Sequence, residues 1–124
     1  APTTMLQQRT TTSPTGRKQA LDGYPVKVCE IFSQIGGVTY LERCSVSSPA
    51  GVNKTKKAVR KAFQCQMDGL GFSMIEILSM CPTNWKMSSV DSCKWIDEVM
   101  TKEFPPGVYK DNIAALKKNA EGQS

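Results

Sequence analysis

One cysteine, Cys81, lies at a position where its thiolate could bind a metal ion. Cys81 directly precedes Pro82 in the run SMCPTNW, at the carboxyl end of a stretch that is typical of a buried strand. In open α/β sheets, ligands and cofactors bind at that edge, and a proline turn fixes the sulfur geometry that a cluster iron requires. Because a cluster usually takes four thiolates, a thiol that fills a small pocket beneath the turn is the simpler interpretation of this run alone.

The first residues form a polar segment that could hold a phosphate. The run APTT, followed by QQRTTTSPTGR, is dense in hydroxyl and amide side chains and contains two arginines. It has neither a Walker pattern nor a dinucleotide-binding fingerprint. A polar connecting loop over residues 1–25 is therefore the default interpretation.

A basic helix over residues 50–67 is the third candidate. Its five cations equal the net charge of +5 of the whole chain: Lys54, Lys56, Lys57, Arg60 and Lys61. Such a stripe could contact RNA or an acidic protein, and the alternative function is then a small basic binding module. No aromatic residues interleave with the charges, so a solvated outer face is the simpler interpretation.

The composition excludes several classes of active site. The 124 residues contain no histidine, which rules out a Ser-His-Asp triad, a Cys-His pair and any zinc site with a histidine ligand. The five cysteines are widely spaced and form no C-x-x-C pair, so they predict free thiols in a reducing, cytoplasmic compartment. No stretch resembles a signal peptide or approaches the ~20 apolar residues of a membrane helix, so we expect no membrane contact.

Hydrophobic periodicity predicts the elements that must position these residues. A short helix follows Pro25, strands are predicted at residues 38–46 and 72–80, and a further helix runs from 90 to about 102. The alternation of helices and strands indicates an α/β fold with parallel strands. The expected inner-face positions of the three helices are Val28, Ile31, Phe32 and Ile35; Val52, Thr55, Val59, Ala62, Phe63 and Gln66, of which Gln66 is weakly suited to burial; and Val90, Cys93, Ile96, Val99 and Met100.

Several of these stretches together resemble a known family. The similarity is to the thiamine-diphosphate-binding (beta) subunit of 2-oxoacid:ferredoxin oxidoreductases, of the 2-oxoisovalerate type. The C-terminal part of that subunit resembles GFSMIEILSMCPTNWKMSSVDSCKWIDEVM and FPPGVYKD. Consecutive earlier blocks resemble, in the same order, APTT, TTTSPTGR, DGYPVKVCEI, VTYLERCSV and VNKTKKAVRKAFQCQ.

The resemblance implies a reaction and its cofactors. A 2-oxoacid is decarboxylated on thiamine diphosphate held with Mg²⁺, electrons leave through a [4Fe–4S] cluster to ferredoxin, and the acyl group passes to coenzyme A. The implied partners are the other subunits of the oxidoreductase, ferredoxin, the 2-oxoacid and coenzyme A, with no nucleic acid and no membrane. The protein's part in such chemistry is to bind and orient the cofactor.

Few site residues carry over from the family. Its G-D-G-D segment and a downstream asparagine loop hold the diphosphate and Mg²⁺, and a block ending in A-P-T-T follows them, which implies that Thr3 and Thr4 lie near the cofactor. The motif that CPTNW resembles supplies the fourth cluster ligand, which implies Cys81 as a metal ligand. The other three ligands, among them a C-x-x-C pair, lie upstream in the family. No catalytic residue is implied.

We therefore expect a fragment of the subunit in which neither cofactor binds fully. The expected divisions are residues 1–48, the end of the thiamine-diphosphate-binding domain; 49–111, a C-terminal extension of the same subunit; and 112–124, a polar tail. The expected fold is the C-terminal part of a thiamine-diphosphate-binding α/β domain, with mostly parallel strands flanked by helices. The sequence departs from the family at Lys86, where a small residue or glycine is usual, and at Ser47-Ser48, where histidine is frequent.

Overall fold

A three-stranded sheet forms the centre of the computed structural model, which describes residues 4–122. The strand order is β2-β1-β3; β2 runs parallel to β1, and β3 runs antiparallel to it. In chain order the elements are α1 (Gln19–Asp22), α2 (Val28–Phe32), β1 (Val38–Ser45), α3 (Pro49–Met67), β2 (Phe72–Leu78), α4 (Pro82–Trp85), α5 (Ser89–Trp95), the π-turn η1 (Ile96–Met100), α6 (Thr101–Glu103), β3 (Gly107–Asp111) and α7 (Ile113–Gly122).

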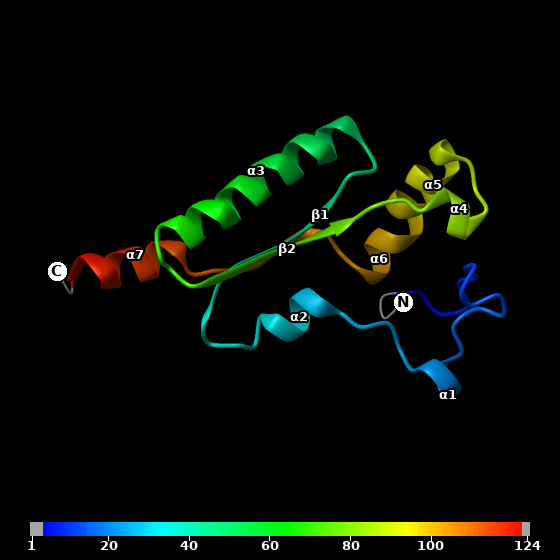
Figure 1. The fold of residues 1–124 in the computed structure, drawn as a ribbon, viewed down its shortest axis with the longest axis horizontal. Coiled ribbons are helices and arrows are strands. Elements are labelled where there is room, and N and C mark those ends of the chain that lie inside the picture. Colours follow the sequence, from blue (N-terminus) through cyan, green and yellow to red (C-terminus); the bar gives the residue numbers. More distant parts are fainter. Residues whose placement is uncertain (1–3, 123–124) are drawn as a thin grey trace.

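Helices lie on both faces of the sheet, which confirms the predicted α/β class. Figure 1 shows α3 along one face, and α2 with the N-terminal segment on the other. The helices α4, α5 and α6 gather beyond the carboxyl end of β2, and α7 lies at the opposite end of the molecule. None of the helices in the described part of the chain combines the length and the apolar character needed to cross a membrane.

Helix α3 begins and packs for reasons that its sequence explains. The hydroxyl of Ser48 accepts a hydrogen bond from the amide of Gly51 at 3.1 Å, and Pro49 occupies the first turn, where a missing N–H does no harm. Thr55, Ala58 and Cys65 form its buried face. Phe63, which the periodicity placed in the core, is 68% exposed. The buried face of α3 is therefore rotated about the helix axis, by part of a turn, from the predicted one.

The region after β2 departs most from the prediction. The single helix expected from residue 90 is divided by the π-turn, and Val90, an expected core position, is 65% exposed, whereas Ile96 is fully buried as expected. Strand β3 was not predicted; it follows Pro105-Pro106 and pairs with β1. The turn expected at CPTNW is the one-turn helix α4.

A small apolar cluster joins the elements at the carboxyl end of β2. Leu78, Ile96 and Phe104 are buried together there. Three half-buried side chains pack against them, one from the N-terminal segment, one from α4 and one from η1: Met5, Trp85 and Met100. This cluster positions the N-terminal segment against α4.

Candidate functional site

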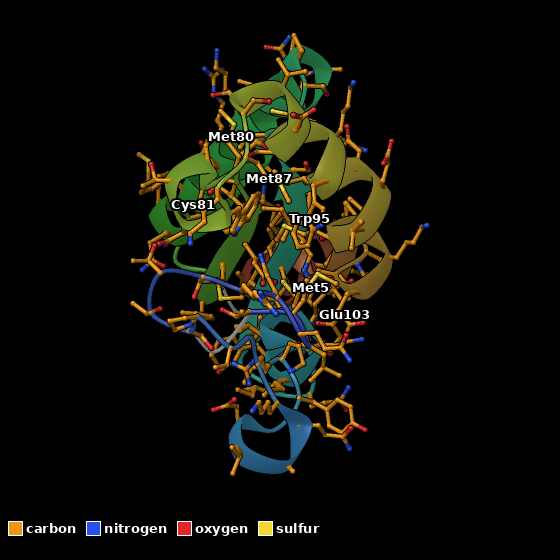
Figure 2. The ribbon with its side chains drawn as sticks, turned by 90° about the vertical axis from the view of Figure 1, so that its right-hand side faces the viewer. Met5, Met80, Cys81, Met87, Trp95 and Glu103 are labelled. Atoms are coloured by element: carbon orange, nitrogen blue, oxygen red, sulfur yellow. The ribbon has the colours of Figure 1, made fainter. Side chains whose placement is uncertain are left out.

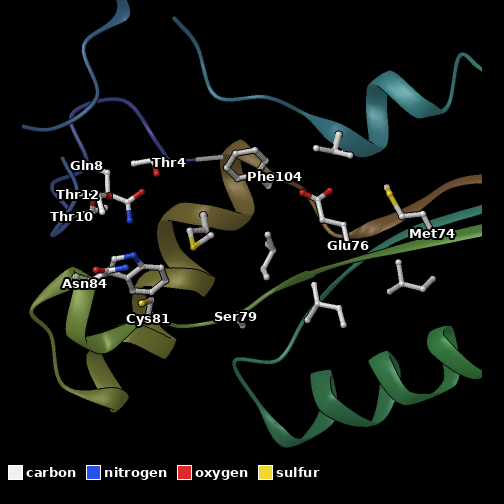
Figure 3. Close-up of a pocket in the computed structure, with 16 residues that line it drawn as sticks. Thr4, Gln8, Thr10, Thr12, Met74, Glu76, Ser79, Cys81, Asn84 and Phe104 are labelled. Atoms are coloured by element: carbon white, nitrogen blue, oxygen red, sulfur yellow. The ribbon is translucent and has the colours of Figure 1, made fainter. Parts of the chain in front are cut away.

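A cavity of about 520 Å³ lies between β2, α4 and the N-terminal segment (Figure 3). It occupies the face of β2 that is opposite α3 and extends to the carboxyl end of the strand, the edge at which open α/β sheets bind ligands. Thr4 and Cys81 both line it. The structure therefore brings together two of the three predicted site residues; the third, Thr3, lies outside the described residues.

Cys81 is the N-cap residue of α4, and its carbonyl oxygen accepts a hydrogen bond from the amide of Trp85 at 3.0 Å. The thiol is half-buried, in contrast to the fully buried Cys29, Cys44 and Cys65. Figure 2 shows Met80, Cys81 and Met87 together at this end of the molecule. The turn predicted from the sequence is present as α4, and the Cys81 side chain lies beside the cavity.

The N-terminal segment contributes the polar wall of the cavity. Thr4, Gln8, Thr10 and Thr12 line it from one side, and Asn84 lines it from α4 (Figure 3). The segment is held in place by the amide of Gln7, which donates to the carbonyl of Arg17 at 2.9 Å. Hydroxyl and amide groups can donate hydrogen bonds to phosphate oxygens, so this wall suits the chemistry predicted for the segment.

Glu76 contributes a carboxylate to the cavity, and no motif in the sequence indicates it as a functional residue. It projects from β2 toward α2, and its Oε2 accepts a hydrogen bond from Nε of Arg43 at 2.8 Å (Figure 3). Arg43 lies opposite it in β1, and its side chain is fully buried. The sequence contained one indication of this residue, a glutamate within an otherwise apolar strand. It did not indicate that Arg43 would be the partner of that glutamate.

Arg43 joins four elements through its guanidinium group. Its two terminal nitrogens donate to the carboxylate of Glu30 in α2 at 2.9 and 2.7 Å, and one of them also donates to the Tyr109 hydroxyl at 2.7 Å. The ring of Phe104 lies 5.4 Å from the guanidinium carbon. Burial alone would lower the pKa of Arg43, but the carboxylates of Glu30 and Glu76 raise it above its ordinary value.

Cys29 is a second thiol close to the cavity residue Glu76, and it is buried. Its side chain is fully buried in α2, and burial together with the nearby Glu76 raises its pKa to about 12. Because the thiolate is the nucleophilic form, burial and the raised pKa make Cys29 a weak nucleophile near neutral pH.

Exposure of the thiols leads to a labelling prediction. At pH 8, iodoacetamide is expected to modify Cys81 and Cys93 in the native chain well before Cys29, Cys44 and Cys65, because the last three are buried. Peptide mass spectrometry after a short pulse checks this order, with a pulse in denaturant as the control, in which all five react. Early labelling of Cys29 would contradict the structure.

Lys86 ends α4 in the left-handed backbone region, with φ of 56° and ψ of 43°. This conformation costs a non-glycine residue about 1–2 kcal/mol. Glycine adopts this conformation without that cost, so the glycine that the resemblance leads us to expect here would suit the turn.

Replacing Lys86 with glycine is therefore expected to raise the free energy of unfolding by about 0.5–1 kcal/mol, because glycine removes the steric conflict at a positive φ. Urea denaturation measures the change. Lys94→Gly, in the exposed face of α5, is the matched control and should be destabilising by about 1 kcal/mol. Loss of stability in both variants would show that the α4 turn is not built as described.

The lining of the cavity limits what it could hold by itself. Within residues 4–122 no group of three or more cysteine, aspartate, glutamate or histidine side chains could hold a metal ion. Cys81 is a single thiol, whereas a [4Fe–4S] cluster requires four ligands. The hydroxyl and amide groups of the wall could donate hydrogen bonds to a diphosphate, but the described residues do not by themselves complete a diphosphate site or a cluster site.

The basic helix is separate from the cavity. Helix α3 covers the opposite face of the sheet (Figure 1). One of its cations, Lys61, is engaged with the sheet: its ammonium lies 4.5 Å from the centre of the Tyr40 ring and 3.1 Å from the Asp111 carboxylate. The cationic stripe and the Cys81 site therefore belong to different surfaces.

Comparison with known proteins finds similarity to oxidoreductase subunits. The chain is 35% identical over 114 residues to the ketoisovalerate oxidoreductase subunit VorA of Methanothermobacter thermautotrophicus. This match covers 92% of the chain and 24% of that protein. It is 36% identical over 111 residues to the VorA subunit of Methanothermobacter marburgensis, with coverages of 90% and 23%. No family model and no solved structure matches.

These similarities confirm the predicted resemblance at the level of homology to ketoisovalerate oxidoreductase subunits. The chain spans about a quarter of the length of the curated relatives that it matches. Similarity over nearly the whole chain is consistent with the role of an enzyme subunit or a part of one.

Proposed function

We propose that this chain is part of the thiamine-diphosphate-binding subunit of a 2-oxoacid:ferredoxin oxidoreductase of the 2-oxoisovalerate type. The observation that carries the proposal is the 35% identity over 114 residues to a ketoisovalerate oxidoreductase subunit. The convergence of Thr4 and Cys81 on one cavity, from opposite parts of the sequence, supports it. The proposed divisions of the chain remain residues 1–48, 49–111 and 112–124.

In this proposal the cavity is where two cofactors approach each other. Cys81 would be one thiolate ligand of a [4Fe–4S] cluster, and Thr4, with Thr3, would lie beside thiamine diphosphate. When bound, these groups supply the decarboxylation chemistry and the electron transfer. The chain's own contribution is to fix one sulfur in the α4 turn, to offer hydroxyl and amide donors, and to hold the Glu76 carboxylate at the cavity wall.

The remaining ligands and partners would come from outside this chain. Three further cluster thiolates and the Mg²⁺ ligands would be supplied by the rest of the subunit, and ferredoxin, coenzyme A and the 2-oxoacid would meet the assembled enzyme. A reducing, cytoplasmic setting suits the five free thiols of the chain.

A chimera tests this function. The chain would replace its 114-residue match in the Methanothermobacter thermautotrophicus subunit VorA, which would then be assembled anaerobically with the other subunits of that enzyme. We expect oxidation of 2-oxoisovalerate that depends on coenzyme A and reduces ferredoxin. A chimera that assembles like the parent enzyme but does not turn over this or another branched 2-oxoacid would contradict the proposal.

A further inference from the structure

A second, smaller hollow lies beside the main cavity, between the N-terminal segment and α4. It has a volume of about 280 Å³, and its lining is Arg9, Thr10, Pro14, Asn84, Trp85 and Lys86. Three of these residues, Thr10, Asn84 and Trp85, also line the main cavity. Figure 3 shows Thr10 on the N-terminal segment and Asn84 on α4. A ligand held in the smaller hollow, which we call the Arg9–Lys86 pocket, can therefore extend into the larger one.

The charges of the Arg9–Lys86 pocket suit an anion. Arg9 and Lys86 are both exposed, and no acidic residue is among the lining residues. Within residues 4–122 neither cation takes part in an ion pair. A guanidinium group and an ammonium group are the usual donors to phosphate oxygens. The hydroxyl of Thr10 and the amide of Asn84 can donate further hydrogen bonds to the same ligand.

Backbone strain occurs on both sides of this pocket. Two non-glycine residues in the described part of the chain have a positive φ, Gln7 at 62° and Lys86 at 56°. Gln7 lies two residues before Arg9, and Lys86 lines the pocket itself. Residues held in such conformations cost stability and cluster at ligand sites. Because glycine would form the α4 turn without that cost, the cation is what a lysine adds at position 86.

The segment that carries Arg9 is held by its own backbone. The amide of Gln7 donates to the carbonyl of Arg17 at 2.9 Å, and Thr10 and Ser13 exchange backbone hydrogen bonds at 3.1 and 3.2 Å. The shape of this segment therefore does not depend on an ion pair of Arg9. A wall that is ordered before binding lowers the entropy cost of holding a ligand.

The opposite wall includes an aromatic ring that is also held in place. Trp85 packs against the buried cluster of Leu78, Ile96 and Phe104, and its ring centre lies 5.0 Å from that of Trp95. An indole ring can stack on the flat ring of a nucleobase. The pocket thus combines donors for phosphate with one aromatic surface.

We propose that the Arg9–Lys86 pocket binds the phosphate groups of a nucleotide substrate of the coenzyme A class, with the thiol-bearing arm extending into the main cavity. The inference rests on the proposed function, in which coenzyme A accepts the acyl group. It is supported by the two exposed cations of the pocket and by the three residues that it shares with the cavity.

Two other anions of the proposed reaction fit the pocket less well. Thiamine diphosphate binds together with Mg²⁺, which prefers carboxylate oxygens, and no acidic residue lines the pocket. The carboxylate of a 2-oxoacid carries a single charge and lies next to the reacting carbon. The two exposed cations instead suit a ligand with several negative charges that binds at the edge of the cavity.

The first test titrates the 124-residue chain, without iron, with three probes: coenzyme A, thiamine diphosphate with Mg²⁺, and inorganic phosphate. Calorimetry measures the affinity, and nuclear magnetic resonance follows the indole N–H of Trp85. We expect coenzyme A to shift the Trp85 signal and to bind at least about tenfold more tightly than the other two probes, because only it places several phosphates and a base in the pocket. The affinity should fall as salt is added.

Substitutions then locate the binding site. Arg9→Met and Lys86→Gly are each expected to weaken coenzyme A binding by at least about tenfold, as for loss of a hydrogen bond to a charged group. The Lys86→Gly chain is expected to be the more stable one, so its loss of binding cannot result from unfolding. Arg60→Met and Lys94→Gly remove exposed cations outside the pocket and are the matched controls, which should bind as the unmodified chain does.

Several results would overturn the inference. They are absence of coenzyme A binding, equal effects of the pocket and control variants, and equal affinity for coenzyme A and inorganic phosphate, which would indicate a simple anion site. Tighter binding of thiamine diphosphate with Mg²⁺ would assign the pocket to that cofactor instead. All of these results are measured on the chain alone, so they are independent of the turnover of the chimera that tests the proposed function.

Discussion

Replacing Arg43 with methionine is expected to lower the free energy of unfolding by about 3 kcal/mol, because removing one partner of a buried ion pair leaves the other partner uncompensated. The side chain of Arg43 is fully buried, and those of Glu76 and Glu30 retain 16% and 34% exposure. Partial access to water keeps the expected loss at the lower end of the usual range for such pairs. Urea denaturation followed by circular dichroism measures the change.

An exposed ion pair gives the matched control. Lys27 and Glu103 lie 3.5 Å apart with 44% and 38% of their side chains exposed, so Lys27→Met should cost less than about 1 kcal/mol. The double variant Arg43→Met with Glu76→Gln should recover part of the loss, since it removes one of the uncompensated carboxylates. Equal stability of Arg43→Met and Lys27→Met would show that the Arg43 network does not stabilise this fold.

The same network predicts a pH dependence. Hydrogen bonds from Arg43 hold the pKa of Glu30 below its ordinary value of 4.5. A carboxyl group with a lowered pKa in the folded chain contributes stability above its unfolded pKa, and that contribution is lost as the pH falls through the folded value. We therefore expect the stability difference between the unmodified chain and Arg43→Met to be full at pH 7 and to shrink below about pH 4.5.

Stability and site geometry are linked through this arginine. Arg43 holds Glu76 from the neighbouring strand and Glu30 from α2, so it fixes both the cavity carboxylate and the helix that covers this face of the sheet. A variant that loses Arg43 should therefore disturb the wall of the cavity without touching Cys81, which lies at the far end of the strand.

Elements with strong local signals could be predicted from the sequence. Helix α3 has a serine cap, a proline in its first turn and nineteen residues of helical periodicity, and the structure confirms it. Strand β1 is rich in β-branched and aromatic residues, and it is nearly all buried. In both elements the local preference and the tertiary environment agree.

Other elements could not be predicted because their environment decides them. Strand β3, GVYKD, is short and polar, and it exists because β1 offers it a pairing edge. The outward position of Phe63 was not evident, since helical periodicity gives a stripe but does not say which part of it the sheet covers. Similarly, Val90 matched the periodicity of a helix that a π-turn divides.

The candidate site, too, was predictable only where a local sequence motif indicates it. A local motif, a cysteine before a proline at the end of a strand, indicated Cys81, and the structure places it beside a cavity. The pairing of Glu76 with Arg43 depends on the register of two parallel strands, which the sequence does not specify. The cavity itself depends on how the N-terminal segment folds back onto α4.

Loss of iron on replacing Cys81 is the second large effect that we expect. A [4Fe–4S] cluster takes four thiolate ligands, so removing one leaves an iron open to solvent and the cluster labile. Alanine is the substitution to use, because a serine oxygen could itself bind iron. Cys93→Ala is the matched control, since Cys93 is also half-buried and its sulfur lies 3.6 Å from that of Met80 at the same end of the molecule.

The most direct measurement is the iron content of the anaerobically reconstituted VorA chimera, in its unmodified, Cys81→Ala and Cys93→Ala forms. We expect the Cys81→Ala chimera to retain less than about half of the iron of the unmodified chimera after desalting, because its cluster would have three thiolates instead of four. The Cys93→Ala chimera should retain all of it. Equal iron in the two variants, with both chimeras folded, would contradict the assignment of Cys81 as a cluster ligand.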